Sequence, residues 1–175
     1  QEEGADFQMV LIDDTTNEIV VPNGTMGERH TNPQKWNLRL ENRDTGAKID
    51  PRLSVFDQRE DVTVVKLPYF GDEEHEGVIE RAIPTITVQT VDGPVKVTTV
   101  YDLILANYGI DRGIGGEVAT SYTDDTPYTP TWQEKITGVK ADIAIATARE
   151  FADNAEKTKG RSMIIMGGGI NHWYH

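Results

Sequence analysis

Hydrophobic and polar residues alternate over short runs in the first part of the chain, the pattern typical of half-buried β-strands. Two such runs, residues 7–12 and 18–21, flank a turn-forming cluster at residues 13–17. Asp, Thr and Asn favour turns because their short polar side chains hydrogen-bond to nearby backbone. The pattern predicts a hairpin here and a further short strand over residues 36–40.

Alternation is strongest between residues 62 and 99. Val62, Val64 and Val65 predict a strand that ends at Pro68. Two further runs, residues 86–90 and 95–99, alternate on either side of Asp92-Gly93-Pro94. This arrangement is the clearest hairpin signal in the chain.

Helical spacing begins at Thr99. Apolar residues follow it at intervals of three and four, Thr99 is placed to cap a helix, and Gly109 is placed to end it. A loop containing Arg112-Gly113-Ile114-Gly115-Gly116 comes next. Glycine-rich backbone can turn several N–H groups toward an anion, but a helix-ending turn has the same composition. Both interpretations stay open at this point.

Two more helices are predicted in the last third of the chain. Thr131-Trp132-Gln133-Glu134 has the form of a capping box, so a short helix is expected to start there and to stop near Gly138. A longer helix is expected over residues 141–157. Its apolar stripe is formed by Ala144, Ala148, Phe151, Ala152 and Ala155.

A short unbroken apolar run, residues 162–166, follows the last predicted helix. Such a run is typical of a strand buried on both faces of a parallel sheet. The predicted fold class is therefore mixed α+β: residues 1–98 form a β-rich region with hairpins. Residues 99–175 form a partial parallel α/β unit that ends in a glycine loop.

Composition narrows the class of function. The net charge is −12, from 29 acidic and 17 basic residues, so binding to nucleic acid through a basic surface is not expected. The acidity fits either a solvated surface or adaptation to high salt. The absence of cysteine excludes disulfides and thiolate-ligated clusters within this segment. The sequence shows neither a targeting signal nor an apolar run of about 20 residues, and both termini read as cut points.

The strongest site signal is the glycine triplet Gly167-Gly168-Gly169, directly after the last predicted strand. Ligands of open α/β sheets bind beyond the carboxyl ends of strands, and glycine lets a phosphate approach the backbone. Asn171, His172 and His175 follow and carry hydrogen-bonding groups. A cofactor-contact loop and an ordinary tight turn both fit this pattern. The two histidines lack a third ligand nearby, so no protein-ligated metal is predicted.

Other polar and aromatic candidates have simpler structural explanations. Trp36 and Trp132 are more typical of core anchors than of ligand platforms. The acidic pairs Asp13-Asp14 and Asp124-Asp125 occur in turn-like sequence, and general acid–base chemistry needs carboxylates held in a shaped cleft. We therefore interpret these acidic residues as turn residues.

Several runs closely resemble the catalytic alpha subunit of membrane-bound respiratory nitrate reductases. The most specific are TPTWQEKITGV, AREFADNAEKT and GRSMIIMGGGINHWYH. Earlier runs agree with them: VVPNGTMGER, KWNLRLE and VTTVYDLILANYGIDRGIGG. The resemblance covers almost the whole chain, and it identifies the chain as an internal fragment of a longer protein.

The resemblance implies an enzyme that reduces nitrate to nitrite in anaerobic respiration. It implies molybdenum bis-molybdopterin guanine dinucleotide and a 4Fe-4S cluster in the parent protein. It also implies an iron–sulfur beta subunit and a quinol-oxidising membrane subunit, so the parent would be membrane-associated through its partners, on a face that the sequence does not decide. The molybdenum and cluster ligands lie upstream in the family, so no catalytic residue is expected here and the fragment alone is expected to be inactive and to bind no cofactor.

Five residues carry over from the resemblance as cofactor-binding candidates: Gly167, Gly169, Asn171, His172 and, more weakly, His175. Two alternatives to the nitrate reductase interpretation remain. One is a nitrite oxidoreductase or a chlorate or selenate reductase of the same family. The other is a stand-alone acidic binding module with a β-rich half.

Overall fold

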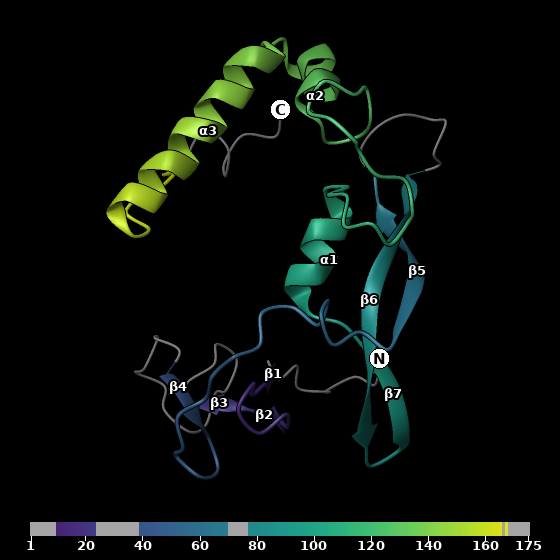
Figure 1. The fold of residues 1–175 in the computed structure, drawn as a ribbon, viewed down its shortest axis with the longest axis vertical. Helices are drawn as coiled ribbons and strands as arrows, with labels where there is room; N and C mark the ends of the chain where they lie inside the picture. The colour runs from purple at the N-terminus through teal and green to yellow at the C-terminus, as the bar shows by residue number, and fades with distance from the viewer. Residues whose placement is uncertain (1–9, 24–38, 70–76, 166, 168–175) are drawn as a thin grey trace. The chain divides into compact units, whose positions relative to one another are not determined.

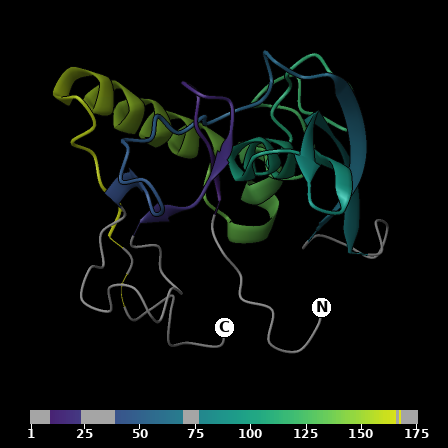
Figure 2. The same cartoon turned by 90° about the horizontal axis from the view of Figure 1, so that it is seen from below.

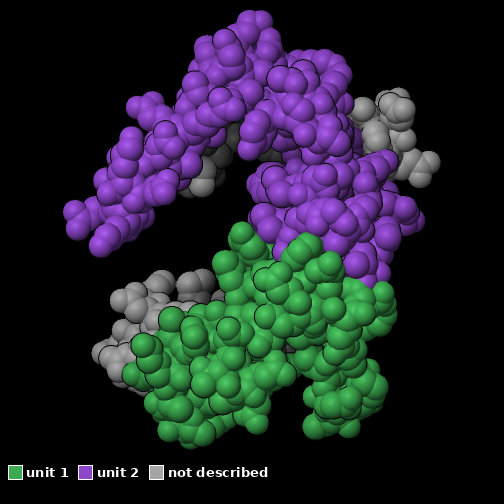
Figure 3. Space-filling model, in the orientation of Figure 1, with its two compact units in different colours: residues 1–61, 84–102 green, residues 62–83, 103–175 purple. Residues whose placement is uncertain are grey.

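The computed structural model describes residues 10–23, 39–69, 77–165 and Gly167. Within them lie seven strands and three helices, so the predicted mixed α+β class is confirmed (Figure 1). The chain divides into two compact units (Figure 3). Unit 1 is Gln1–Asp61 with Pro84–Asp102, and unit 2 is Val62–Ile83 with Leu103–His175.

The first predicted hairpin is present in unit 1. Strand β1 (Leu11–Ile12) pairs antiparallel with β2 (Ile19–Val20), and the pairing places Leu11 opposite Val20. Asp13 opens the turn, and its buried carboxylate accepts the N–H groups of Thr15 and Asp50 at 3.0 and 3.3 Å. The turn interpretation of Asp13 is confirmed by its hydrogen bond from the Thr15 N–H, and the bond from Asp50 also links the hairpin to a segment 37 residues away.

A second small sheet in unit 1 joins β3 (Pro22–Asn23) to β4 (Arg39–Asn42), with an irregular register between them. The strand predicted over residues 36–40 is confirmed at residues 39 and 40 and continues to Asn42, and residues 36–38 lie outside the described residues. A turn follows β4 at residues 43–45. The next residue, Gly46, has a φ of 70°, a conformation that glycine adopts without steric cost.

The largest sheet contains β5 (Asp61–Pro68), β6 (Val78–Thr90) and β7 (Gly93–Val97), in that order (Figure 1; seen from below in Figure 2). The strand ending at Pro68 and the hairpin around Asp92 are both confirmed: β6 and β7 are antiparallel. The sequence did not indicate the first half of β6, where Ile79, Arg81 and Ile83 are all buried.

Helix α1 (Val100–Asn107) forms as its capping signals predict. The Thr99 hydroxyl oxygen accepts the Asp102 N–H at 3.1 Å and also donates to the Asp102 carboxylate at 2.7 Å. The fully buried Asp102 accepts two more hydrogen bonds, from the Ser54 hydroxyl at 2.7 Å and the Val55 N–H at 2.9 Å. The first turn of α1 thus fixes an upstream segment of unit 1.

Helix α2 (Pro130–Thr137) starts earlier than predicted. Thr129, not Thr131, is the N-cap, and its hydroxyl accepts the Trp132 N–H at 3.2 Å. Proline at the first helical position explains the shift, because its fixed φ suits a helix start and its missing N–H costs nothing there. The predicted end is confirmed: Gly138 closes the helix with a φ of 73°.

Helix α3 (Ala141–Thr158) is confirmed over its predicted length, but none of its residues is buried. The buried strand predicted after it is wrong for this chain. Residues 162–165 form no strand, and Met163, Ile164 and Ile165 are 78%, 73% and 84% exposed. A central strand needs a neighbour on each side, and the described residues place none there.

Candidate functional site

The predicted cofactor loop is described at one of its candidate residues. Gly167 is exposed, and a Cβ built on it would have no other atom within 4 Å. Its φ lies outside the left-handed region, so a side chain there would be neither crowded nor strained. Gly169, Asn171, His172 and His175 lie outside the described residues. The cofactor-contact assignment of all five therefore stays a prediction.

A buried arginine is the most unusual polar group in the described chain. Arg81, on β6, is fully buried. Its Nε, Nη1 and Nη2 atoms are all inaccessible to solvent and have no hydrogen-bond acceptor among the described residues. Leaving a buried donor unpaired costs about 1–3 kcal/mol, and more for a charged group. Within the described residues, the burial of this arginine is therefore not offset by any side-chain hydrogen bond.

Two glycines make room for this guanidinium and its backbone. A Cβ on Gly109 would lie 3.0 Å from Arg81 Nη2, and a Cβ on Gly116 would lie 2.9 Å from the Ala82 backbone nitrogen. Both glycines have a positive φ, 68° and 89°. The loop after α1 thus closes over Arg81 at positions where any larger side chain would collide.

One carboxylate lies near the buried charge. Glu117 Oε2 is 4.0 Å from Arg81 Nη1, beyond hydrogen-bond distance, and the Glu117 side chain is 57% exposed. Burial lowers the pKa of Arg81, while the charges of Glu117 and Tyr128 raise it. Arginine stays protonated at physiological pH, so the group cannot escape its burial by losing a proton.

The glycine loop at residues 112–116 was a candidate anion-binding loop. Gly113, Gly115 and Gly116 all have a positive φ. The Gly113 N–H is already occupied, because it donates to Asp111 Oδ1 at 2.9 Å. One backbone donor of the loop thus binds a carboxylate of the chain itself, and Gly116 packs against β6. The geometry favours the helix-ending turn over an anion cradle.

Trp132 anchors an aromatic cluster in unit 2, as predicted for a core tryptophan. Its ring lies 5.3 Å from the Tyr128 ring and 6.2 Å from the Tyr69 ring. Its Nε1–H donates to the Tyr69 hydroxyl at 3.2 Å. The cluster joins the end of β5 to the start of α2. Trp36 lies outside the described residues.

The second acidic pair also has a structural role. Asp124 accepts the N–H groups of Thr120 and Ser121 at 2.8 and 3.0 Å, and hydrogen bonding to Thr120 is the main reason that its pKa is lowered. Asp125 forms an ion pair with Lys135. The turn interpretation of this pair is confirmed.

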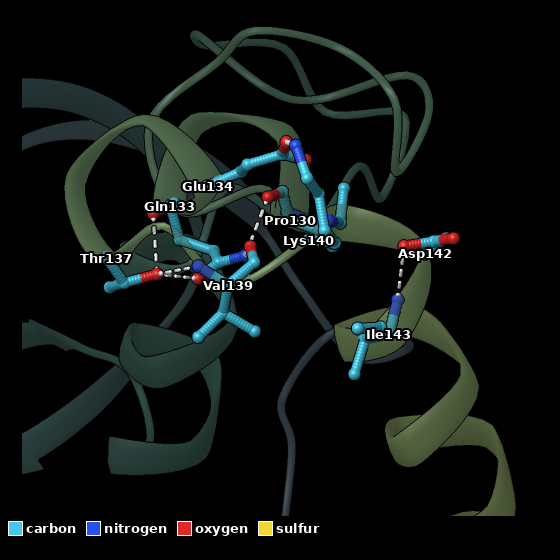
Figure 4. A network of polar contacts seen from close by, with 9 residues as sticks. Pro130, Gln133, Glu134, Thr137, Val139, Lys140, Asp142 and Ile143 are labelled. Atoms are coloured by element: carbon cyan, nitrogen blue, oxygen red, sulfur yellow. Dashed lines mark hydrogen bonds and ion pairs between the residues drawn. The ribbon is translucent and has the colours of Figure 1, made fainter.

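Hydrogen bonds fix the elbow between α2 and α3, shown in Figure 4. Glu134 accepts Lys140 Nζ at 2.6 Å and the Ala141 N–H at 2.8 Å, so it caps the second helix from the first. Gln133 Nε2 donates to the Pro130 and Val139 carbonyls at 3.0 and 2.8 Å. The hydrogen bond from Lys140 lowers the pKa of Glu134, and the same bond raises the pKa of Lys140.

The described residues contain no group of three or more His, Asp or Glu side chains arranged to hold a metal ion. None of their helices has both the length and the apolar character needed to cross a membrane.

The known proteins to which this chain is similar are nitrate reductase alpha chains, the family that the sequence motifs resemble. No protein family model matches the chain. The chain is 47% identical over 163 residues to the nitrate reductase alpha chain of Bacillus subtilis, covering 93% of this chain and 13% of that protein. It is 45% identical over 185 aligned residues to the respiratory nitrate reductase 1 alpha chain of Escherichia coli, covering 100% and 15%.

A nitrate reductase alpha subunit of Mycobacterium tuberculosis is 43% identical over 180 aligned residues, which cover 100% of this chain and 14% of that protein. The predicted resemblance to nitrate reductase alpha chains is therefore confirmed over nearly the whole chain. This chain spans only about one seventh of the length of these curated relatives, as expected for a fragment of a longer protein.

Proposed function

We propose that this chain is part of the catalytic alpha chain of a respiratory nitrate reductase, which reduces nitrate to nitrite. One observation carries the proposal: 45% identity over the whole chain to a protein named as a respiratory nitrate reductase alpha chain. Similarity at this level, over two structural units with different folds, is not expected from a stand-alone acidic module.

The parent protein would hold molybdenum bis-molybdopterin guanine dinucleotide, which supplies the oxygen-atom and electron-transfer chemistry when bound, and a 4Fe-4S cluster. Its electrons would arrive through an iron–sulfur beta subunit from a quinol-oxidising membrane subunit, and these partners would make the alpha chain membrane-associated. This assembly rests on the family resemblance. The described residues contribute scaffold to it, because their polar clusters cap turns and helices.

The contribution of this chain to the cofactor would be the loop from Gly167 to His175. Gly167 is open to solvent with no neighbouring atom, so a ligand could approach its backbone closely. Asn171 and His172 would then donate to the phosphates or the pterin edge, with His175 as a weaker contact. Open backbone at Gly167 fits both this role and an exposed turn, and substitution of Gly167 distinguishes the two.

The enzymatic proposal is tested in the complete polypeptide. The open reading frame around these 175 residues should extend far beyond them, and the purified protein should form nitrite from nitrate with reduced viologen as electron donor. Chlorate and selenate, supplied in parallel, test the related reductases. A frame that stops at these residues, or a complete protein that carries molybdenum but turns over selenate and not nitrate, would contradict the proposal.

Gly167→Val tests the loop. In this chain the valine meets no atom and no backbone strain, so the melting temperature of the 175-residue chain should stay within about 1–2 °C, because unstrained surface changes stay within about 0.5 kcal/mol. In the complete protein the same side chain should collide with a bound dinucleotide and lower the molybdenum content several-fold. Normal molybdenum content, measured by mass spectrometry, would remove Gly167 from the cofactor site. Ala146→Val, at an exposed position of α3 without a positive φ, is the control.

A further inference from the structure

Unit 2 contains a large groove that the proposed function does not use. Its volume is about 810 Å³, and α3 forms one of its walls. The opposite walls come from the end of α1, the loop that follows it, and the start of α2. Tyr108, Tyr122 and Tyr128 are among the lining residues. Figure 3 shows the hollow within unit 2, beside the arm that α3 forms.

Apart from Arg149, the residues of α3 that line the groove have apolar side chains, most of them small. Ala144, Ala148 and Ala152 line the groove at intervals of four residues, so they form one ridge along the helix, with Ile145 beside it. Alanine side chains let another element approach the helix backbone closely. The opposite face of α3 carries Asp142, Glu150 and Asp153. This division into an apolar and a charged face is typical of a helix that packs against something.

Nothing in the described chain covers that ridge. No residue of α3 is buried, and α2 is the element against which α3 packs. Just after the helix, Met163, Ile164 and Ile165 add three more exposed apolar side chains. Exposed apolar side chains that gather on one surface mark interaction sites, and the α3 ridge is such a gathering.

The charge in the groove limits what can occupy it. Its two charged lining residues are Asp111 and Arg149. Asp111 already accepts the Gly113 N–H, whereas the Arg149 side chain has no hydrogen bond or ion pair with any described residue. Arg81 adds a second positive charge behind Gly109, which lines the groove. The carboxylates of Asp111 and Glu117, the latter 4.0 Å from Arg81, equal these two positive charges in number. Arg149 is therefore the charged side chain of the groove that lacks a partner among the described residues.

The relatives indicate where an occupant would come from. This chain corresponds to 13% to 17% of their length, so more than four fifths of such a polypeptide lies outside these residues. A segment of the same polypeptide is present at high effective concentration, unlike a second copy or a separate protein. It is therefore the occupant that the observations favour.

We propose that, in the complete polypeptide, an apolar segment from outside these 175 residues fills the groove and places a carboxylate against Arg149. The proposal rests on the proposed function only in taking the chain as part of a longer alpha chain. It assigns the apolar face of α3 to intramolecular packing, with Arg149 fixing the register of the incoming segment.

The accessibility of engineered cysteines tests whether a segment fills the groove in the complete polypeptide. Ala148→Cys places a thiol on the ridge, and Ala146→Cys is the matched control on the charged face of the same helix. This chain has no other cysteine, and peptide mapping identifies the labelled position in the complete polypeptide. In the 175-residue chain both thiols should react with a maleimide at similar rates. In the native complete polypeptide the thiol at position 148 should react at least tenfold more slowly than the thiol at position 146.

The other outcomes are distinct. Equal rates in the complete polypeptide would overturn the proposal. Protection that appears only when partner subunits are added, or that vanishes on dilution, would replace it with a subunit or self-association interface. If Ala148→Cys does not fold, hydrogen exchange of the unmodified protein decides: the α3 amides should exchange more slowly in the complete polypeptide. A preparation that reduces nitrate while position 148 stays reactive would refute the proposed packing in the groove but not the proposed function. A preparation in which position 148 is protected but nitrate is not reduced would refute the proposed function alone.

Charge substitution tests the carboxylate. In the Ala148→Cys complete polypeptide, Arg149→Glu should raise the labelling rate several-fold, because two carboxylates would then face each other. Arg149→Lys should keep the protection, since it keeps the positive charge. Unchanged protection in Arg149→Glu would show that the occupant carries no carboxylate at this position.

Discussion

Replacing Arg81 with methionine should stabilise the 175-residue chain. The guanidinium is fully buried, none of its three nitrogens has an acceptor among the described residues, and its nearest carboxylate is 4.0 Å away. Methionine is unbranched and flexible, so it can fill the space left by the arginine chain without adding a charge. The substitution removes an unmet desolvation cost and keeps most of the packing.

The expected gain in the free energy of unfolding can be judged from similar substitutions of buried charges. Replacing buried, poorly compensated ion pairs by hydrophobic residues of similar volume is neutral or stabilising by about 1–4 kcal/mol. For a chain of 175 residues, each kcal/mol corresponds to roughly 2–4 °C in melting temperature. Because Arg81 stays protonated through the neutral range, this gain should not depend on pH between about 5 and 9.

Urea denaturation followed by circular dichroism measures the change, with a constant m-value as evidence that only stability has changed. Arg149→Met is the control, since the Arg149 side chain is exposed and has no partner among the described residues, so its replacement should change stability by less than about 0.5 kcal/mol. Arg81→Lys keeps a buried charge that is more strongly hydrated than guanidinium, so it should be less stable than Arg81→Met. A loss of about 3–5 kcal/mol in Arg81→Met would refute the reasoning, because only a properly paired arginine is that costly to remove.

Three further predictions concern the scaffold. Gly116→Ala should cost about 2 kcal/mol more than Gly113→Ala in thermal melts, because both carry a positive φ but only a Cβ at 116 meets backbone, at 2.9 Å. Asp102→Ala should cost about 3 kcal/mol or more by the same measurement, since it leaves three donors without their acceptor. The pKa of Glu134 is lowered in the folded chain, so the stability it contributes is present above its usual value of 4.5 and is lost as the pH falls through the folded pKa. The pKa of Lys140 is raised, so its contribution holds below 10.5 and is lost only above that value. Melting temperature against pH should fall less steeply on the acid side in Glu134→Gln than in the unmodified chain, and an identical fall would exclude this pair as the cause.

The elements that the sequence predicts well are those specified by neighbouring residues. Helix α1 has its cap at Thr99 and its terminating glycine at 109, and both signals lie within one turn of the helix ends. The β6–β7 hairpin has a turn cluster between two alternating runs. The start of α2 was misplaced by two residues because two threonines offered a cap, and the proline that follows Thr129 decided between them.

The features that sequence patterns missed depend on distant parts of the chain. Arg81 shares a strand face with Ile79 and Ile83, and this i, i+2, i+4 spacing was the available signal that its side chain points inward. The strand predicted over residues 162–166 has the composition of a central strand but no neighbours among the described residues. The amino-acid composition of a segment reflects its surroundings in the complete protein. A strand, however, forms only where neighbouring strands are present to pair with it.

Three charged side chains are buried among the described residues, and they differ in whether this chain supplies their hydrogen-bond partners. Asp13 and Asp102 accept hydrogen bonds from nearby turn and cap residues and from segments of the same unit. Carboxylates are readily satisfied in this way, because backbone N–H groups are abundant at turns and helix starts. Arg81 needs acceptors in the plane of its guanidinium, and the loop that closes over it presents none.

The sign of the Arg81→Met effect can therefore be compared between the 175-residue chain and the complete polypeptide. A gain in stability in the first and a loss in the second would mean that residues outside this chain bring, or push into place, an acceptor for the arginine. A gain in both would make Arg81 an uncompensated charge in the native protein as well.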